Sequence, residues 1–284
     1  MEKLQAALEK ARERRGDAPV SSGIVESDAA APSTPRERGV SSLDQRWAAL
    51  EEFQTDPSHL IKNRVFSAGS KQSEAASFDV LRTKALKQME KNGWKRLAVT
   101  SANSGAGKST VCCNLASSIA RQRSIRAILM DLDMRRPALA DILGVKPTGT
   151  VADVLNGSLP FEQHARRLGP NVALSLNAHR VKDPSDVFLN TSTTETVNRI
   201  EAEYKPSIML FDVPPMFVND DAAAFFTNVD CVLIVADAER SRVADLDRCE
   251  KEVADHTNVL GMVLNKCRHS DEGYGYGYNS SETY

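Results

Sequence analysis

The chain has 284 residues, of which 41% are hydrophobic and 26% charged, as is typical of a soluble globular protein. Its formal net charge of −2 excludes the strong basic field of a protein whose main partner is nucleic acid. The five cysteines form no CxxC pair and the five histidines show no zinc-ligand spacing, so we expect neither a disulfide framework nor a zinc site. The longest apolar runs reach roughly eight residues, whereas a membrane span needs about 20. We therefore expect a cytoplasmic protein without a transmembrane helix.

The first part of the chain precedes the domain that we expect to carry the chemistry. Residues 1–16 place apolar side chains at helical spacing, which predicts an amphipathic helix that is either solvated or docked on a partner or membrane surface. Residues 17–41 are rich in Pro, Ser, Ala and Gly and predict a disordered linker. Residues 42–94 predict a helical lead-in segment, with a first helix capped by Ser42 or Asp44 and a longer second helix.

From residue 95 to residue 268, short apolar runs alternate with helical segments. The expected strands are 96–101, 127–133, 172–178, 208–214, 231–238 and 259–266, and the expected helices are 107–122, 137–143, 185–204, 219–228 and 242–254. Near-continuous apolar strands separated by helices predict an α/β fold with a mostly parallel sheet flanked by helices. Ligands of such sheets bind beyond the carboxyl ends of the strands, so we expect the functional residues there.

A phosphate-binding loop follows the first of these strands. The sequence SANSGAGKST has P-loop spacing, with Ala102 at the position often occupied by Gly, and it lies between a strand and a helix. Its glycines let backbone N–H groups surround a phosphate, and the following helix directs its N-terminus at the same anion. We expect Lys108 to neutralise the β- and γ-phosphates and the Ser109 hydroxyl to bind Mg²⁺. The predicted nucleotide-binding residues of the loop are Ser104, Gly105, Ala106, Gly107, Lys108, Ser109 and Thr110.

Acidic residues end two later strands. ILMDLDMRRP carries Asp131 and Asp133 two positions apart, so their side chains point to one side of an extended chain, and IMLFDVPP closes an apolar run at Asp212, as a Walker B motif does. Carboxylates at these positions predict a metal or general-base site. Asn265 ends the last strand and predicts either an adenine contact or a simple turn. The predicted catalytic residues are Lys108, Asp131, Asp133 and Asp212, and the predicted metal ligands are Ser109, Asp133 and Asp212.

Together these motifs resemble the bacterial tyrosine kinases of capsular and exopolysaccharide synthesis. TSANSGAGKSTVCCNLA resembles the Walker A segment of that family, ILMDLDMRRP its Walker A′ and FDVPP its Walker B, with further similarity in GTVADVLNG, DPSDVF and NDDAAAF. The resemblance covers roughly residues 60–284. It implies a P-loop NTPase fold like that of MinD and ParA, ATP and Mg²⁺ as cofactors, and transfer of the γ-phosphoryl group to tyrosine. A tyrosine hydroxyl needs a base, and we expect Asp131 to be that base.

The last stretch, 269–284, predicts a flexible tail that holds four of the five tyrosines of the chain. By the resemblance, Tyr274, Tyr276, Tyr278 and Tyr284 form the autophosphorylation cluster; a solubilising tail with a chance cluster is the alternative. The resemblance also implies a membrane-bound polysaccharide co-polymerase as activator, a homo-oligomer, a phosphotyrosine phosphatase as a further partner, and a location at the inner face of the plasma membrane through a partner.

Departures from the family pattern leave other hypotheses open. Members of the family often carry an ExxRxxR pattern on the helix before the domain. In this sequence Ala76 and Asp79 occupy the first two positions of that pattern, and only the last arginine is present. Arg82 is therefore the single predicted oligomer contact, and a ring-shaped assembly is not assured. A MinD/ParA-like ATPase switch is a second hypothesis, although Asn103 replaces the usual lysine of its loop. A non-catalytic nucleotide-binding scaffold is a third.

Overall fold

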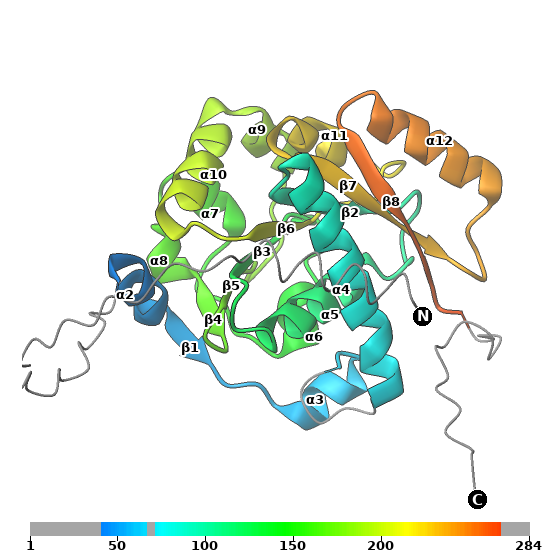
Figure 1. Cartoon of the computed structure of the whole chain (residues 1–284). Coiled ribbons are helices and arrows are strands. Elements are labelled where there is room, and N and C mark those ends of the chain that lie inside the picture. Colours follow the sequence, from blue (N-terminus) through cyan, green and yellow to red (C-terminus); the bar gives the residue numbers. More distant parts are fainter. Residues whose placement is uncertain (1–40, 67–71, 268–284) are drawn as a thin grey trace, which may run out of the picture. The chain divides into compact units, whose positions relative to one another are not determined.

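The computed structural model of the chain describes residues 41–66 and 72–267, which belong to one compact unit (Figure 1). The expected helix over 1–16, the expected linker up to residue 40 and the tyrosine-bearing segment lie outside the described residues. Within the two described stretches, no helix is both long and apolar enough to cross a membrane.

An eight-stranded sheet forms the centre of this unit, in the order β1-β4-β5-β3-β6-β2-β7-β8 (Figure 1). Neighbouring strands are parallel except for β4 and β5. The strands are β1 (Glu51–Phe53), β2 (Arg96–Thr100), β3 (Ala127–Asp131), β4 (Arg166–Leu168), β5 (Val172–Ser175), β6 (Ile208–Asp212), β7 (Cys231–Asp237) and β8 (Asn258–Asn265). The mostly parallel α/β sheet predicted from the sequence is thus confirmed.

Helices cover both faces of the sheet. Alternate residues of β3 belong to two separate apolar clusters, Ile128 and Met130 to one and Leu129 to the other, because successive side chains of a strand point to opposite faces. The helices are α2 (Ser42–Ala49), α3 (Pro57–Lys62), α4 (Gln72–Asn92), α5 (Lys108–Ala120), α6 (Leu139–Leu143), α7 (Val151–Leu155), α8 (Phe161–His164), α9 (Pro184–Leu189), α10 (Thr191–Tyr204), α11 (Asp221–Phe225) with a 3₁₀ turn after it, and α12 (Val243–Ala254).

The sequence predicts a helical lead-in segment, but this segment also contributes a strand. α2 ends at Ala49, and β1 follows and pairs in parallel with β4. Trp47 fixes this segment to the domain: it is 1% exposed, its ring contacts Tyr204 edge to face, and its Nε1 donates to the Tyr204 carbonyl at 2.9 Å. The segment from Ser41 onward therefore packs as part of the same unit as the P-loop region.

The cap of α2 lies one residue earlier than predicted. Ser41 Oγ accepts the backbone N–H of Asp44 at 3.1 Å, and the Asp44 side chain accepts the backbone N–H of Ser41, which completes a capping box. Asp44 thus contributes to the cap as the third helical residue and not as the capping residue itself.

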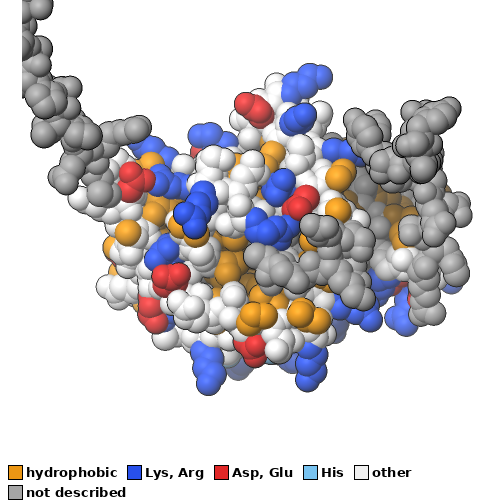
Figure 2. All heavy atoms as spheres, turned by 60° about the horizontal axis from the view of Figure 1, so that its bottom comes forward, with side chains coloured by type: hydrophobic (Ala, Val, Ile, Leu, Met, Phe, Trp, Pro, Cys, Tyr) orange, Lys and Arg blue, Asp and Glu red, His pale blue; other side chains and the backbone are white. Residues whose placement is uncertain are grey.

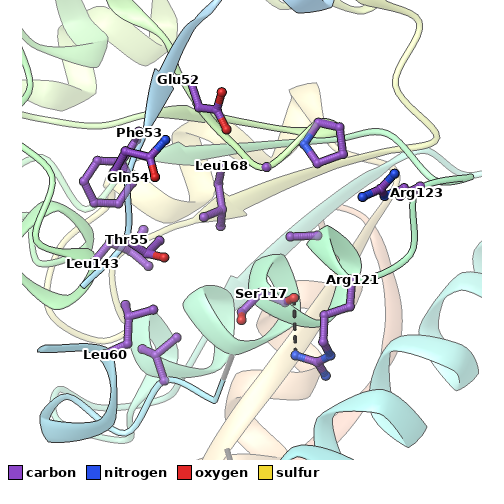
Figure 3. A pocket seen from close by; sticks show the side chains of 14 residues that line it. Glu52, Phe53, Gln54, Thr55, Leu60, Ser117, Arg121, Arg123, Leu143 and Leu168 are labelled. Atoms are coloured by element: carbon purple, nitrogen blue, oxygen red, sulfur yellow. Dashed lines mark hydrogen bonds between the residues drawn. The ribbon is translucent and has the colours of Figure 1, made fainter. Parts of the chain in front are cut away.

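A cavity of about 520 Å³ lies between β1, the end of α5 and the β4–β5 turn (Figure 3). Phe53, Leu60 and Leu168 form part of its apolar wall, and Arg121 donates to the Ser117 carbonyl at its side. None of the predicted site residues lines this cavity. A view of the molecule from below also shows hydrophobic side chains gathered near the middle of the face, with Lys and Arg side chains around them (Figure 2).

Candidate active site

The loop between β2 and α5 has the backbone that a phosphate-binding loop requires. Gly105 and Gly107 have φ angles of +84° and +95°, a region that favours glycine. A Cβ atom at Gly107 would lie 2.2 Å from the side-chain nitrogen of Asn265, so a larger residue there would displace this side chain from the loop. α5 begins at Lys108, and the first N–H groups of a helix lack intrahelical partners. The loop and the helix N-terminus therefore offer backbone donors to an anion.

Lys108 lies against the first acidic motif. Its Nζ is 3.6 Å from Asp133 Oδ2, and the two side chains are 7% and 11% exposed. Burial raises the pKa of Asp133, and Lys108 acts in the opposite direction. The fold thus joins two of the four predicted catalytic residues in one buried ion pair.

The remaining two predicted catalytic residues face each other across neighbouring strands. Asp131 ends β3 and Asp212 ends β6, and the two are paired in the strand register. Both are fully buried, and neither carboxylate has a hydrogen-bond partner of ordinary length and angle among the described residues. Burial raises the pKa of both carboxyls; Asp212 adds to the rise at Asp131, whereas Lys108 and Ser109 counteract the rise at Asp212. Weaker interactions with Leu139 and Asn177 oppose the rise in the pKa of Asp131, and those with Ser109 and Cys112 oppose the rise in the pKa of Asp212. Such a pair is costly unless a proton or a cation accompanies it.

The donor set fits a hard divalent cation. Mg²⁺ prefers oxygen ligands, and in nucleotide sites it takes one or two carboxylates together with phosphate oxygens and waters. The unpartnered oxygens of Asp212, with Ser109 beside them and Asp133 nearby, supply ligands of this kind. Among the described residues, no group of three or more His, Cys, Asp or Glu forms a complete metal site.

The end of β8 holds the phosphate-binding loop from the other side. Asn265 Nδ2 donates to the Ala106 carbonyl at 2.8 Å, and Lys266 Nζ donates to the Gly105 carbonyl at 2.6 Å and to Asp237 Oδ2 at 2.8 Å. The hydrogen bond from Lys266 holds the pKa of Asp237 below its ordinary value. Asn265 thus contacts the phosphate-binding loop through its amide donor, and its predicted adenine contact stays a prediction.

Sequence reasoning missed Lys266 and Asp237. The available signals were the aspartate that closes the apolar run of β7 and the lysine that follows VLN in β8. Two strand ends of this kind come together only if β7 and β8 are neighbours, which they are.

Arg82, the predicted oligomer contact, has its partners within the chain. One guanidinium nitrogen donates to Asp79 Oδ1 at 3.2 Å and to the carbonyl and hydroxyl of Ser118 at 3.1 and 3.0 Å. Asp79 also pairs with Arg121, the residue after α5, and the Arg82 side chain is 16% exposed. Asp79, one of the two residues that depart from the family pattern, is therefore an acceptor for Arg82, which also binds Ser118 of α5 directly.

The fold and site define a class of protein: a P-loop nucleotide-binding domain on a mostly parallel sheet. In agreement, residues 97–274 match the family described as the CobQ/CobB/MinD/ParA nucleotide binding domain. The chain belongs to this family.

The chain is also similar to individual proteins named as tyrosine kinases. It is 30% identical over 200 residues to the "Putative tyrosine-protein kinase EpsB" of Ralstonia nicotianae, an alignment that covers 69% of this chain and 26% of that protein. It is 26% identical over 211 residues to the "Tyrosine-protein kinase CpsD" of Streptococcus agalactiae, covering 70% of this chain and 87% of that one. The crystal structure of the chimerical protein CapA2B2 superposes with a TM-score of 0.64 at 20% identity, covering 76% of this chain and 91% of that chain, which establishes the shared fold. The chain spans about a quarter of the length of EpsB.

Proposed function

We propose that the chain is an ATP-dependent protein-tyrosine kinase that phosphorylates its own tyrosine cluster, Tyr274, Tyr276, Tyr278 and Tyr284. The observation that carries this proposal is the pair of buried, unpartnered carboxylates, Asp131 and Asp212, beside the lysine of a P-loop. Similarity to proteins named tyrosine-protein kinase supports the choice of acceptor.

In this proposal the loop residues Ser104 to Thr110 hold the phosphates of ATP. Lys108 lies against the β- and γ-phosphates, and Ser109, Asp133 and Asp212 hold Mg²⁺. When bound, the ion neutralises charge on the phosphate oxygens. Asn265 keeps the loop in place and lies beside the region where the base of the nucleotide binds.

The phosphoryl transfer then needs a base, because a tyrosine hydroxyl has a pKa of about 10. Asp131 accepts the proton of the tyrosine hydroxyl as the phenolic oxygen forms a bond to the γ-phosphorus. The bond from the γ-phosphorus to the bridging oxygen breaks, and ADP leaves with that electron pair. The products are phosphotyrosine, ADP and a proton, which Asp131 returns to solvent.

We extend the proposal to the whole protein as a regulator of exopolysaccharide synthesis and export. A membrane polysaccharide co-polymerase is the proposed activator, and it brings the kinase to the inner face of the plasma membrane. Self-association presents the tyrosines of one copy to another, and a phosphotyrosine phosphatase resets them. The similarity to CpsD over most of the length of that protein supports the assignment as a kinase.

A partner-binding ATPase switch is the second candidate, since the family match includes MinD and ParA. Asn103 stands in place of the loop lysine of that branch, and its Nδ2 donates to Asp245 Oδ2 of α12 at 3.4 Å. The chain therefore lacks the loop lysine of such switches, which counts against this second candidate.

The test is incubation of the purified chain with ATP and Mg²⁺, with and without a candidate activator, followed by mass spectrometry of residues 269–284. We expect phosphotyrosine in the wild type and none in Lys108→Met or in the variant with four Tyr→Phe changes. ADP release without phosphotyrosine would instead identify an ATPase switch, and nucleotide binding without turnover would identify a scaffold. Either outcome refutes the kinase proposal.

A further inference from the structure

The last strand of the sheet has an open edge. β8 pairs with β7 on one side and ends the strand order, so along its outer side no described strand pairs with it. Proteins usually protect such an edge with charges, proline or a bulge. β8 has a bulge at Leu260, but it contains neither proline nor a charged residue, and its Met262 and Leu264 are 43% and 60% exposed. An edge of this kind is suited to accept an added strand.

A groove runs beside this edge, between β8 and α4. Its volume is about 530 Å³, and its apolar lining includes Leu81, Ala85, Leu233, Leu260 and Val263. Figure 1 shows the two elements next to each other, with β8 running opposite to α4.

Three lysines of α4 give the groove a positive rim. Lys84, Lys87 and Lys91 all contribute to its lining and are exposed. They are three and four positions apart, so they lie on one side of the helix. The salt bridges among the described residues involve none of the three. The groove therefore combines a free strand edge, an apolar floor and unneutralised positive charge, which suits an extended acidic peptide.

We propose that this groove binds residues 270–284 of the same chain once their tyrosines are phosphorylated. The segment has the matching chemistry: it contains Asp271, Glu272 and Glu282 and no Lys or Arg. It also begins five residues after the end of β8, and the chain leaves β8 through Lys266, whose φ of +61° belongs to a turn and not to a strand.

The segment is long enough to reach the whole groove. Its 15 residues span up to about 50 Å when extended, whereas the eight residues of β8 span about 27 Å. After a reversal, it can lie antiparallel to β8 and pass all three lysines.

The proposed binding requires phosphorylated tyrosines, and in this respect the inference rests on the proposed function. Phosphorylation of Tyr274, Tyr276 and Tyr278 adds roughly −4.5 to −6 charges to the segment. Glycines alternate with these tyrosines, so the phosphates follow one another at two-residue spacing. Binding in the groove thereby keeps the phosphorylated segment away from the active sites, so autophosphorylation slows as its product accumulates.

The experiment uses the full chain carrying Lys108→Met, which removes autophosphorylation. A fluorescent synthetic peptide of residues 270–284 is added, either unmodified or phosphorylated at Tyr274, Tyr276 and Tyr278, and binding is followed by anisotropy. We expect the phosphopeptide to bind at least about tenfold more tightly than the unmodified one, because several ammonium–phosphate contacts together supply about 1.4 kcal/mol or more.

Charge reversal locates the site. Changing Lys84, Lys87 and Lys91 to Glu should weaken phosphopeptide binding at least about tenfold. The matched control changes three other exposed lysines to Glu, with the same effect on net charge and no expected effect on binding: Lys62, Lys146 and Lys182. Hydrogen exchange of the backbone amides from Gly261 to Leu264 should slow when the phosphopeptide is added, a readout that needs no variant.

Three results overturn the inference: no phosphopeptide binding, equal weakening in both charge-reversal variants, or a change of oligomeric state in the groove variant with unchanged peptide binding. The last result would identify the surface as a contact between copies. Because the phosphate is introduced by synthesis, this test is independent of the kinase reaction. Failure of peptide binding would not contradict the kinase proposal. Absence of phosphotyrosine after incubation with ATP would not contradict phosphopeptide binding in the groove.

Discussion

Asp131→Asn should make the protein more stable while it removes the proposed activity. The carboxylate is fully buried beside Asp212, and none of the described residues donates a hydrogen bond of ordinary length and angle to it. The substitution keeps the shape of the side chain and replaces one of two like charges with a neutral amide that can donate to its neighbour.

The magnitude follows from the strand pairing. Neighbouring strands are about 4.8 Å apart, and two unit charges at about 5 Å repel by about 3 kcal/mol at an effective dielectric constant of about 20. Protonation of one carboxyl relieves part of this repulsion in the wild type, so we expect a gain of about 1–3 kcal/mol in the free energy of unfolding. For a domain of this size, the gain corresponds to a rise in Tm of roughly 2–10 °C.

The assay is thermal unfolding at pH 7.5 in EDTA, with Asp133→Asn as the matched control. Asp133 differs because Lys108 lies 3.6 Å away, and its removal leaves a buried ammonium without its partner. Asp133→Asn should therefore lower the free energy of unfolding by about 1–3 kcal/mol, the opposite sign. Equal destabilisation by the two substitutions would refute the reasoning that Asp131 is held at a cost to stability.

Three further predictions concern other parts of the domain. His164 is buried, and burial lowers its pKa to about 4, so as the pH falls the unfolded chain binds a proton at this residue before the folded chain does. Between pH 6.5 and pH 4 the wild type should therefore lose about 3 kcal/mol of its free energy of unfolding, and His164→Gln should not show this loss. Urea unfolding of both proteins at the two pH values measures the difference. Lys266→Met should weaken ATP binding about tenfold in calorimetry, because the loop loses its contact at the Gly105 carbonyl, whereas Lys146→Met should have no effect. Trp47→Ala should cost about 3–5 kcal/mol in urea unfolding, and a cost below about 1 kcal/mol would show that the lead-in segment is dispensable.

The parallel strands and the site at their ends were predictable from the sequence. AILMD and IMLFD are continuous apolar runs that close on an aspartate, and a sheet covered on both faces requires such runs. The P-loop was recognisable because its glycines and lysine have a fixed spacing between a strand and a helix.

Other elements left too little signal in the sequence. β1 and β4 have three residues each, fewer than two periods of strand alternation, and β1 extends a segment that reads as helix. The helix predicted over 185–204 is two helices, because Asn190 leaves the helical conformation and caps α10 through the N–H of Ser192.

The contacts that complete the site depend on strand order. Asp131 faces Asp212 because β3 and β6 are neighbours, and Lys266 reaches Asp237 because β7 and β8 are neighbours. Sequence spacing carries no information on which strands are adjacent, so these pairs could be placed at the same edge of the sheet but not assigned to each other.

The position of β1 has a practical consequence for shortened versions of the protein. A chain that started at residue 95, where the apolar strands begin, would lose the only described strand beside the outer edge of β4 and would leave a hole where Trp47 meets Tyr204. Such a fragment would leave the edge of β4 unpaired and would lose the buried contacts of Trp47, so it would be expected to be less stable. For recombinant work, we expect a stable fragment to retain the α2 cap and therefore to begin no later than Ser41.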